Sequence, residues 1–233
     1  MKPTETSVPE PPPAPPSAQG VFSHLLPLAE QFADLLTREA TVRGLIGPRE
    51  VTRLWDRHIL NCAVITDLMP EGSTVCDLGS GAGLPGIALA IRRPDLQVTL
   101  VEPLLRRTTF LDLATSTMEL TNVSVHRGRA EELHGEAVFD VVTSRAVAPM
   151  DRLTRWSMPL VNDGGQFLAM KGATAEQELE SAARIIGRLG GVEPQVVSVG
   201  EEWLSPPVTV VRIRKSGMTS QSRQSGGHPG VSR

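Results

Sequence analysis

The regular alternation of two residue patterns constrains the fold of this chain more than any other feature of its sequence. From residue 74 onwards, short runs rich in β-branched residues alternate with longer stretches of helical periodicity. Such alternation predicts an α/β fold, in which helices cover both faces of a mostly parallel sheet. Strands are expected at residues 74–79, 97–102, 123–126, 139–144, 165–172, 195–200 and 208–214, with helices at 84–93, 104–119, 148–158 and 174–191.

The short connection between the last two expected strands indicates the direction of the final strand. The segment between residues 195–200 and 208–214 is too short for the helix that a parallel connection requires. We therefore expect a seven-stranded sheet with an antiparallel final strand.

Helical periodicity also dominates the region before the first expected strand. Apolar residues recur at helical spacing between positions 25 and 36 and again between 51 and 65. We expect residues 21–70 to form an N-terminal helical cap on a core domain of residues 71–215. Seven of the 19 prolines fall within residues 3–16, and residues 216–233 are almost devoid of apolar side chains. Residues 1–20 and 216–233 are therefore expected to be disordered tails.

Composition excludes several classes of function. The whole chain has a formal net charge of −3. Residues 1–19 contribute −1 and residues 216–233 contribute +2, so residues 20–215 carry −4. A body this acidic cannot attract nucleic acid by bulk charge, so a polyanion site must be a local patch. Tyr is absent and Phe and Trp total eight, so the aromatic platform of single-strand binders is not expected.

Cysteine usage and hydropathy indicate the compartment. Cys62 and Cys76 are too few for a disulfide scaffold and lack metal-ligand spacing, so we expect buried thiols and no metal site. No apolar stretch approaches the roughly 20 residues of a membrane span, and residues 1–20 lack a secretory signal. We expect a cytoplasmic protein that is a monomer and makes no membrane contact.

A glycine-rich turn follows the first expected strand. DLGSGAGLPG, residues 77–86, leads from this strand into a helix, and Gly79, Gly81 and Gly83 permit a tight turn that a ligand can approach closely. The same segment satisfies the dinucleotide pattern G-x-G-x-x-G. Glu102, at the end of the second strand, is placed to bind both ribose hydroxyls of an adenosine, a feature common to both cofactor classes.

Asp77 favours S-adenosylmethionine over a dinucleotide. Its carboxylate, just before the turn, would meet the cationic methionine part of the cofactor, whereas it would repel a pyrophosphate. After the third strand, the Ala130 backbone N–H and Glu131 are placed to read the adenine edge, although Glu131 also fits a surface charge on a loop. Ser80 and Leu84, within the turn, complete the expected cofactor site.

Four segments together resemble one protein family. DLGSGAGLPGIALAI (77–91), RHILNC (57–62), FDVVTSRA (139–146) and AMKG (169–172) are similar to the bacterial 16S ribosomal RNA (guanine-N7) methyltransferase G family, also called glucose-inhibited division protein B. The similarity spans roughly residues 40–175.

The resemblance implies a class I methyltransferase fold and a specific reaction. A methyl group would pass from S-adenosylmethionine, leaving S-adenosylhomocysteine, to N7 of one guanosine in the 530-loop decoding region of 16S rRNA. The substrate would be the RNA or the assembled 30S subunit. Many relatives have Asn-Leu-Thr where this chain has Gly44-Leu45-Ile46, so no role of that Asn is transferred.

The residues after the fourth strand agree with a proton-free acceptor. Guanine N7 has a lone pair and no proton, so its methylation needs alignment and electrostatics rather than a general base. Ser144-Arg145-Ala146 stands where amine methyltransferases often carry Asp/Asn-Pro-Pro-aromatic. We expect Arg145 to line the cofactor crevice and donate to guanine O6 or a flanking phosphate, and Lys171 to contact a phosphate. A structural ion pair for Arg145 and a solvated strand end for Lys171 remain alternatives.

The second half of the cap carries a candidate RNA surface. Arg49, Arg53 and Arg57 are spaced i, i+4 and i+8, which on a helix aligns them on one face. A solvated face, with Glu50 as a local partner, is the alternative. His58 lies on the apolar side and fits a hydrogen-bonded histidine at a domain junction. The family resemblance strengthens the assignment of Arg57 and His58 to the site.

Two other functions fit parts of this pattern. An NAD-dependent dehydrogenase would share the glycine turn, but it needs a hydride-transfer partner such as a positioned His or a Tyr-Lys pair, and Tyr is absent. A non-catalytic adenosyl-binding ribosome assembly factor would share the cofactor site without needing Arg145 or Lys171.

Overall fold

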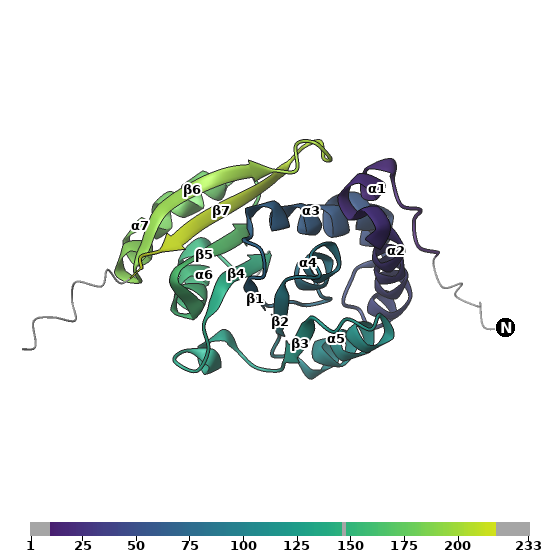
Figure 1. Cartoon of the computed structure of the whole chain (residues 1–233), viewed down its shortest axis with the longest axis horizontal. Helices are drawn as coiled ribbons and strands as arrows, with labels where there is room; N and C mark the ends of the chain where they lie inside the picture. Colours follow the sequence, from purple (N-terminus) through teal and green to yellow (C-terminus); the bar gives the residue numbers. More distant parts are fainter. Residues whose placement is uncertain (1–9, 146–147, 218–233) are drawn as a thin grey trace, which may run out of the picture.

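A single seven-stranded sheet organises the computed structural model, which describes residues 10–145 and 148–217 (Figure 1). The strand order is β3-β2-β1-β4-β5-β7-β6, with parallel pairing from β3 to β5 and β7 antiparallel to both of its neighbours. The expected antiparallel final strand is thus present. The strands are β1 Thr74–Leu78, β2 Gln97–Val101, β3 Val123–His126, β4 Phe139–Arg145, β5 Val161–Met170, β6 Gly191–Val199 and β7 Val208–Lys215.

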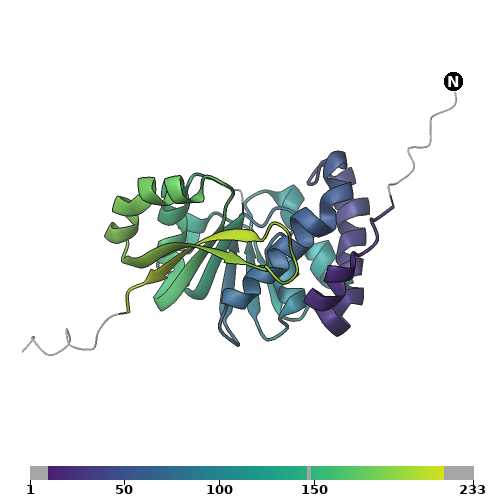
Figure 2. The same ribbon diagram turned by 90° about the horizontal axis from the view of Figure 1, so that it is seen from above.

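Helices cover both faces of the sheet, as the alternation of patterns predicts. Helices α4 (Gly86–Arg92) and α5 (Leu105–Thr117) share one buried cluster with the N-terminal cap, whereas α6 (Met150–Ser157) and α7 (Ala175–Arg188) belong to a second. Successive strand residues alternate between the clusters: Val141 joins the first and Val142 the second. The cap and α7 lie toward opposite ends of the molecule (Figure 2).

The cap is helical but irregular. Helices α1 (Pro16–Phe22), α2 (Leu26–Leu35) and α3 (Leu60–Ala63) are joined by short 3-10 turns and π-helical turns. The bounds of these turns are η1 Ser23–Leu25, η2 Leu36–Ala40, η3 Pro48–Arg53, η4 Leu54–Ile59 and η5 Val64–Leu68.

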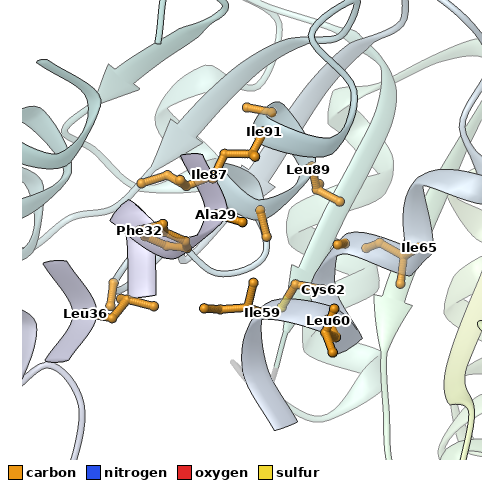
Figure 3. Packing of buried hydrophobic residues seen from close by; sticks show 14 of the residues in the cluster. Ala29, Phe32, Leu36, Ile59, Leu60, Cys62, Ile65, Ile87, Leu89 and Ile91 are labelled. Carbon is orange, nitrogen blue, oxygen red and sulfur yellow. The ribbon is translucent and has the colours of Figure 1, made fainter. Parts of the chain in front are cut away.

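The cap docks on α4 through a continuous apolar contact. Phe32 from the first half of the cap lies next to Ile87 of α4, and Leu36, Ile59 and Ile91 belong to the same buried cluster (Figure 3). All five side chains are fully buried. At about 1.5–3 kcal/mol for each large apolar side chain removed from water, this contact stabilises the docking of the cap on the sheet.

The predicted N-terminal tail is shorter than expected. Residues 1–9 lie outside the described part of the chain, but α1 begins at Pro16, and Ala18 is fully buried. The carbonyl of Pro12 accepts a hydrogen bond of 2.9 Å from Trp55 Nε1. Proline content alone misplaced this boundary, because proline suits the first turn of a helix and the apolar residues behind it pack on the cap. In the other predicted tail, residues 218–233 also lie outside the described residues.

Two strands begin earlier than expected. β5 begins at Val161 and β6 at Gly191, each four residues before its predicted start. Register shifts accompany both extensions, one between Phe139 and Val141 and one between Val192 and Gln195. Such irregularities let glycine-rich and polar residues continue a strand that periodicity does not reveal. No helix among residues 10–145 and 148–217 is long and apolar enough to cross a membrane.

Two helical glycines provide a test of the N-terminal boundary. A Cβ placed on Gly20 would collide with the Trp203 ring, whereas one on Gly187 in α7 meets nothing within 4 Å. We expect Gly20→Ala to lower the free energy of unfolding by about 1–3 kcal/mol through overpacking. Gly187→Ala should raise it by about 0.4–1 kcal/mol by restricting the unfolded chain. Urea denaturation measures both changes, and a Gly20→Ala protein as stable as the Gly187→Ala control would show that α1 does not pack on Trp203.

Candidate functional site

The strand order of the sheet reverses between β1 and β4. β1 pairs with β2 on one side and with β4 on the other. In open α/β sheets this topology places a ligand crevice at the carboxyl ends of these strands. The glycine turn follows β1 at this edge, Glu102 follows β2 directly, and Arg145 ends β4. Residues predicted to form the cofactor site therefore meet at the place where open α/β sheets bind ligands.

The turn depends on three glycines with left-handed backbone. Gly79, Gly81 and Gly83 have φ values of 74°, 57° and 85°, which a residue with a side chain rarely adopts. A Cβ on Gly81 would face open space, with only the Gly79 carbonyl oxygen near, at 3.8 Å. Ser80 is buried, and its hydroxyl donates to the Asp77 carbonyl oxygen at 2.9 Å. Leu84 is half-buried and packs on the core shared with the cap.

Asp77 is a buried carboxylate with one unused oxygen. Its Oδ2 accepts a hydrogen bond of 2.9 Å from the Gly86 N–H, and Oδ1 has no partner among the described residues. Complete burial raises the pKa of Asp77 to about 7. A buried carboxylate oxygen without a partner is costly to keep, and a cationic ligand beside it would satisfy it. These properties fit the role predicted for Asp77.

Glu102 is also fully buried, but both of its oxygens have partners. Oε2 accepts from the Gly81 N–H at 3.1 Å and from Arg107 Nη1 at 3.2 Å, and Oε1 accepts from the Leu104 N–H at 3.1 Å. Glu102 thus ties the glycine turn to the start of α5. A carboxylate has about four acceptor positions, so one remains for a hydroxyl, and a second hydroxyl would compete with the partly exposed Arg107.

The predicted adenine-reading residues follow β3. Ala130 and Glu131 open the short 3-10 turn η6 (Ala130–Leu133). Ala130 is half-buried and packs on the α6–α7 side, while Glu131 is exposed. Their position after β3 agrees with the prediction, and their contact with adenine stays a prediction.

Arg145 reaches from the end of β4 into the cap. Its Nη1 donates to Cys62 Sγ at 3.2 Å, and its Nη2 donates to His58 Nδ1. The other ring nitrogen of His58, Nε2, lies 2.8 Å from Glu50 Oε2. Burial, followed by the charge of Arg145, lowers the pKa of His58. The cap and the sheet are therefore joined by a chain of polar contacts that runs from Glu50 through His58 to Arg145, which we call the polar chain.

Lys171 is part of a second polar cluster. Only 8% of its side chain is exposed, and Nζ donates to Glu178 Oε2 at 2.7 Å and to the Ala148 carbonyl oxygen at 2.9 Å. The same Glu178 oxygen accepts the Met150 N–H at 3.1 Å, and hydrogen bonding to Lys171 lowers the pKa of Glu178. Lys171 therefore anchors the start of α6, and a phosphate at Nζ would compete with Glu178.

A pocket of about 1380 Å³ adjoins the crevice on the β4–β5–β7 side. Its walls come from the cap, from the starts of α6 and α7, and from the segment before β7. Residues with polar or charged side chains in its lining include Arg57, Asn61, Arg145, Lys171, Thr174 and Gln177.

The cap arginines do not form the regular row that their spacing predicts. Arg49 and Arg53 lie in a 3-10 turn and Arg57 in a π-helical turn, so the i, i+4 rule of an α-helix does not apply across them. All three are exposed, and Arg57 Nε lies 3.7 Å from Glu50 Oε2. The prediction of a straight stripe is wrong, while their role in RNA binding stays a prediction.

Sequence reasoning missed three residues of the site. Glu50 figured only as a local partner of arginines, and neither the contact of Cys62 with Arg145 nor that of Glu178 with Lys171 was foreseen. Glu50 precedes His58 by eight residues, but a 3-10 turn and a π-helical turn lie between them, so no regular helical spacing predicts their contact. Glu178 lies on another element from Lys171, and no sequence pattern pairs them.

Comparison with known proteins decides the family. A family profile described as rRNA small subunit methyltransferase G matches residues 26–205. The chain belongs to this family. It is 54% identical over 209 residues to the ribosomal RNA small subunit methyltransferase G of Streptomyces avermitilis, covering 89% of this chain and 88% of the relative. The protein of the same name from Nocardioides sp. is 55% identical over 205 residues, with 88% and 82% covered.

A solved structure shows the fold class independently. The SAM-dependent O-methyltransferase from Thermotoga maritima superposes with a TM-score of 0.53 at 14% identity, covering 67% of this chain and 65% of that one. The chain thus has the class I methyltransferase fold that its sequence predicts. Among residues 10–145 and 148–217, no cluster of three or more His, Cys, Asp or Glu side chains is arranged to hold a metal ion.

The raised pKa of Asp77 predicts how stability varies with pH. Because the folded-state pKa, about 7, exceeds the ordinary 3.8, the folded protein holds this proton more tightly than the unfolded chain. The contribution of Asp77 to the free energy of unfolding therefore falls as pH rises from about 4 to about 7. Asp77→Asn removes this titration, so its stability relative to the parent should increase over that interval by up to about 4 kcal/mol.

Asp140 provides a control, because its pKa is shifted in the opposite direction to that of Asp77. Hydrogen bonds from the Thr74 backbone N–H and hydroxyl lower the pKa of Asp140, so its stabilising effect is present above pH 4 and lost in acid. Urea denaturation of the ligand-free Asp77→Asn and Asp140→Asn proteins between pH 3 and 8 measures both effects. Parallel curves for Asp77→Asn and the parent would contradict the assignment.

Proposed function

We propose that this rRNA methyltransferase transfers the methyl group of S-adenosylmethionine to N7 of one guanosine in the 530-loop region of 16S rRNA, on the RNA or the assembled 30S subunit. The observation that carries the proposal is the unpartnered oxygen of buried Asp77 beside the glycine turn, close enough to Arg145 for their charges to interact. Membership of the methyltransferase G family supports methyl transfer to rRNA over the dehydrogenase alternative.

The cofactor site is proposed from the residues around β1 and β2. Asp77 would face the cationic methionine part, Glu102 the ribose hydroxyls, and Ala130 and Glu131 the adenine edge. Gly81 leaves room for the cofactor, since a Cβ there would face open space. When bound, S-adenosylmethionine supplies an electrophilic methyl group. Binding of a cation next to Asp77 favours its carboxylate form, which offsets the cost of ionising a buried acid.

The acceptor site is proposed at Arg145. Guanine N7 needs no deprotonation, so the protein has to hold the base in line and keep its lone pair available. The Arg145 guanidinium donates only, which suits guanine O6 and leaves N7 unprotonated. Neutral His58 and the buried Cys62 hold this guanidinium at the mouth of the adjoining pocket. The pocket is large enough for a nucleotide turned out of its RNA helix.

RNA capture is proposed for the cap. Residues 20–215 carry −4, so the exposed Arg49, Arg53 and Arg57 form a local positive patch on an acidic protein. Arg57 also lines the pocket beside Arg145. Lys171 is proposed to hold the start of α6 at this pocket and to contact a phosphate only in exchange with Glu178. The protein is expected to act in the cytoplasm as a monomer.

Substrate-side variants should separate RNA chemistry from cofactor binding. We expect Arg145→Ala and Lys171→Ala to reduce methyl transfer to 30S subunits by about 10- to 1,000-fold, the range of roughly 1.4–4 kcal/mol of lost stabilisation. Their affinity for S-adenosylhomocysteine, measured by calorimetry, should stay within about twofold of the parent. The control is Arg214→Ala, which removes an exposed arginine of β7 paired with Glu193, away from the crevice.

The outcomes distinguish the alternatives. Labelled methyl groups should appear at guanine N7, as shown by strand cleavage at the modified base. Cofactor affinity without any methyl transfer by the parent protein would leave the ribosome assembly factor as the better function. Loss of cofactor affinity equal to the loss of activity would remove Arg145 from the substrate site.

The salt dependence of RNA binding tests the cap patch. Each arginine–phosphate contact releases counterions, so replacing Arg49, Arg53 and Arg57 by Ala should reduce the slope of log affinity against log salt by up to about 2–3 units. The charge-matched control replaces Arg184, Arg188 and Arg214, which are exposed on α7 and β7. Equal slopes for the two triple variants would show that bulk charge, not the cap, captures RNA. Loss of the slope on deleting residues 216–233 would assign capture to that segment.

A further inference from the structure

Glu50 stands at the outer end of the polar chain that holds Arg145. It lies in the 3-10 turn η3 of the cap, and its side chain is 36% exposed. Its Oε2 contacts His58 Nε2 at 2.8 Å, and the opposite ring nitrogen of His58 faces Arg145 Nη2. Glu50 thus lies one imidazole ring away from the guanidinium and does not line the pocket.

The donor and acceptor rules assign the tautomer of His58. A guanidinium carries only N–H donors, so His58 Nδ1 must accept from Arg145. The ring proton of neutral His58 then sits on Nε2 and is donated to Glu50. A carboxylate that holds a histidine in one tautomer and orientation is a recurrent device of active sites.

We propose that Glu50 is a positioning residue for methyl transfer: by accepting the Nε2–H of His58, it keeps Nδ1 available to hold the Arg145 guanidinium against the substrate base. The inference rests on the proposed function, which makes Arg145 the group that touches guanine. Glu50 itself touches neither cofactor nor RNA in this scheme.

The surroundings of His58 support the neutral form. Burial and the positive charge of Arg145 lower its pKa, while Glu50 opposes that shift. Burial raises the pKa of Cys62, which leaves a neutral thiol as the second acceptor for Arg145. The charged groups that act on this cluster are Glu50, Arg53 and Arg57 from the cap, Asp77 from β1 and Arg145 from β4. In acid, protonated His58 would present two donors and release Arg145.

Glu50 has one competing partner. Arg57 Nε lies 3.7 Å from the same Oε2, so Glu50 could act by holding Arg57 toward RNA. A double-mutant cycle separates the two routes. Glu50→Ala is made in the parent, in Arg57→Ala and in His58→Ala, and kcat and KM are measured with saturating cofactor and 30S subunits. Glu39→Ala is the control, since it removes another cap carboxylate paired with an arginine, Arg43 at 3.0 Å.

We expect Glu50→Ala to lower kcat about 10- to 100-fold with little change in KM. This range is typical of groups that do not touch the bound species but orient a residue that does. The same factor should persist in Arg57→Ala and fall below about twofold in His58→Ala. A factor that persists in His58→Ala, or that vanishes in Arg57→Ala, would overturn the proposal. Glu39→Ala should match the parent.

A spectroscopic measurement without RNA and a pH profile of kcat with 30S subunits test the same point. The ¹⁵N shifts of the His58 ring should report the Nε2–H tautomer in the parent protein. Glu50→Gln should lower the pKa of His58 and move the acid limb of the kcat profile to lower pH, because the charge that favoured imidazolium is gone. An Nδ1–H tautomer, or an acid limb that does not move, would refute positioning by Glu50. Absence of methyl transfer by the parent would instead refute the proposed function, with the tautomer still readable.

Discussion

The close approach of Gly86 to β1 is the contact on which the rest of the structure depends. Its N–H donates to buried Asp77, and a Cβ in its place would lie 2.8 Å from the Asp77 Oδ2 and collide with the Leu100 side chain. Only glycine lets α4 begin this near the sheet. The same contact sets the path of the turn that faces the ligand, so one hydrogen bond serves both the fold and the site.

The cap follows from the position of α4. Because α4 presents Ile87 and Ile91 to the cap, the segment carrying Glu50, His58 and Cys62 is brought over the end of β4. The site is therefore assembled from two regions that are far apart in sequence and that neither region could form alone. A cap that loosened would leave Arg145 without its partners His58 and Cys62.

Much of this arrangement follows from local patterns, and the rest does not. Strand and helix alternation identified all seven strands, and the shared location of Asp77, Glu102 and Arg145 at one edge of the sheet follows from the carboxyl ends of parallel strands. Pairings between side chains on different elements, such as Lys171 with Glu178, depend on tertiary distances that periodicity does not carry. The irregular cap turns and the packing of residues 10–20 on the cap do not follow from local patterns for the same reason. A hydrogen bond from Trp55 and close contact with Trp203 override local propensity there.

The contact between Gly20 and Trp203 joins the first helix of the fold to the hairpin loop between its last two strands. During synthesis α1 leaves the ribosome before any strand, whereas Trp203 follows the first six strands of the sheet. The N-terminal helix therefore cannot reach its final burial until those six strands have been made. Packing of α1 against Trp203 is therefore a late, long-range event in folding. In a chain truncated before the hairpin, α1 would lack its contact with Trp203.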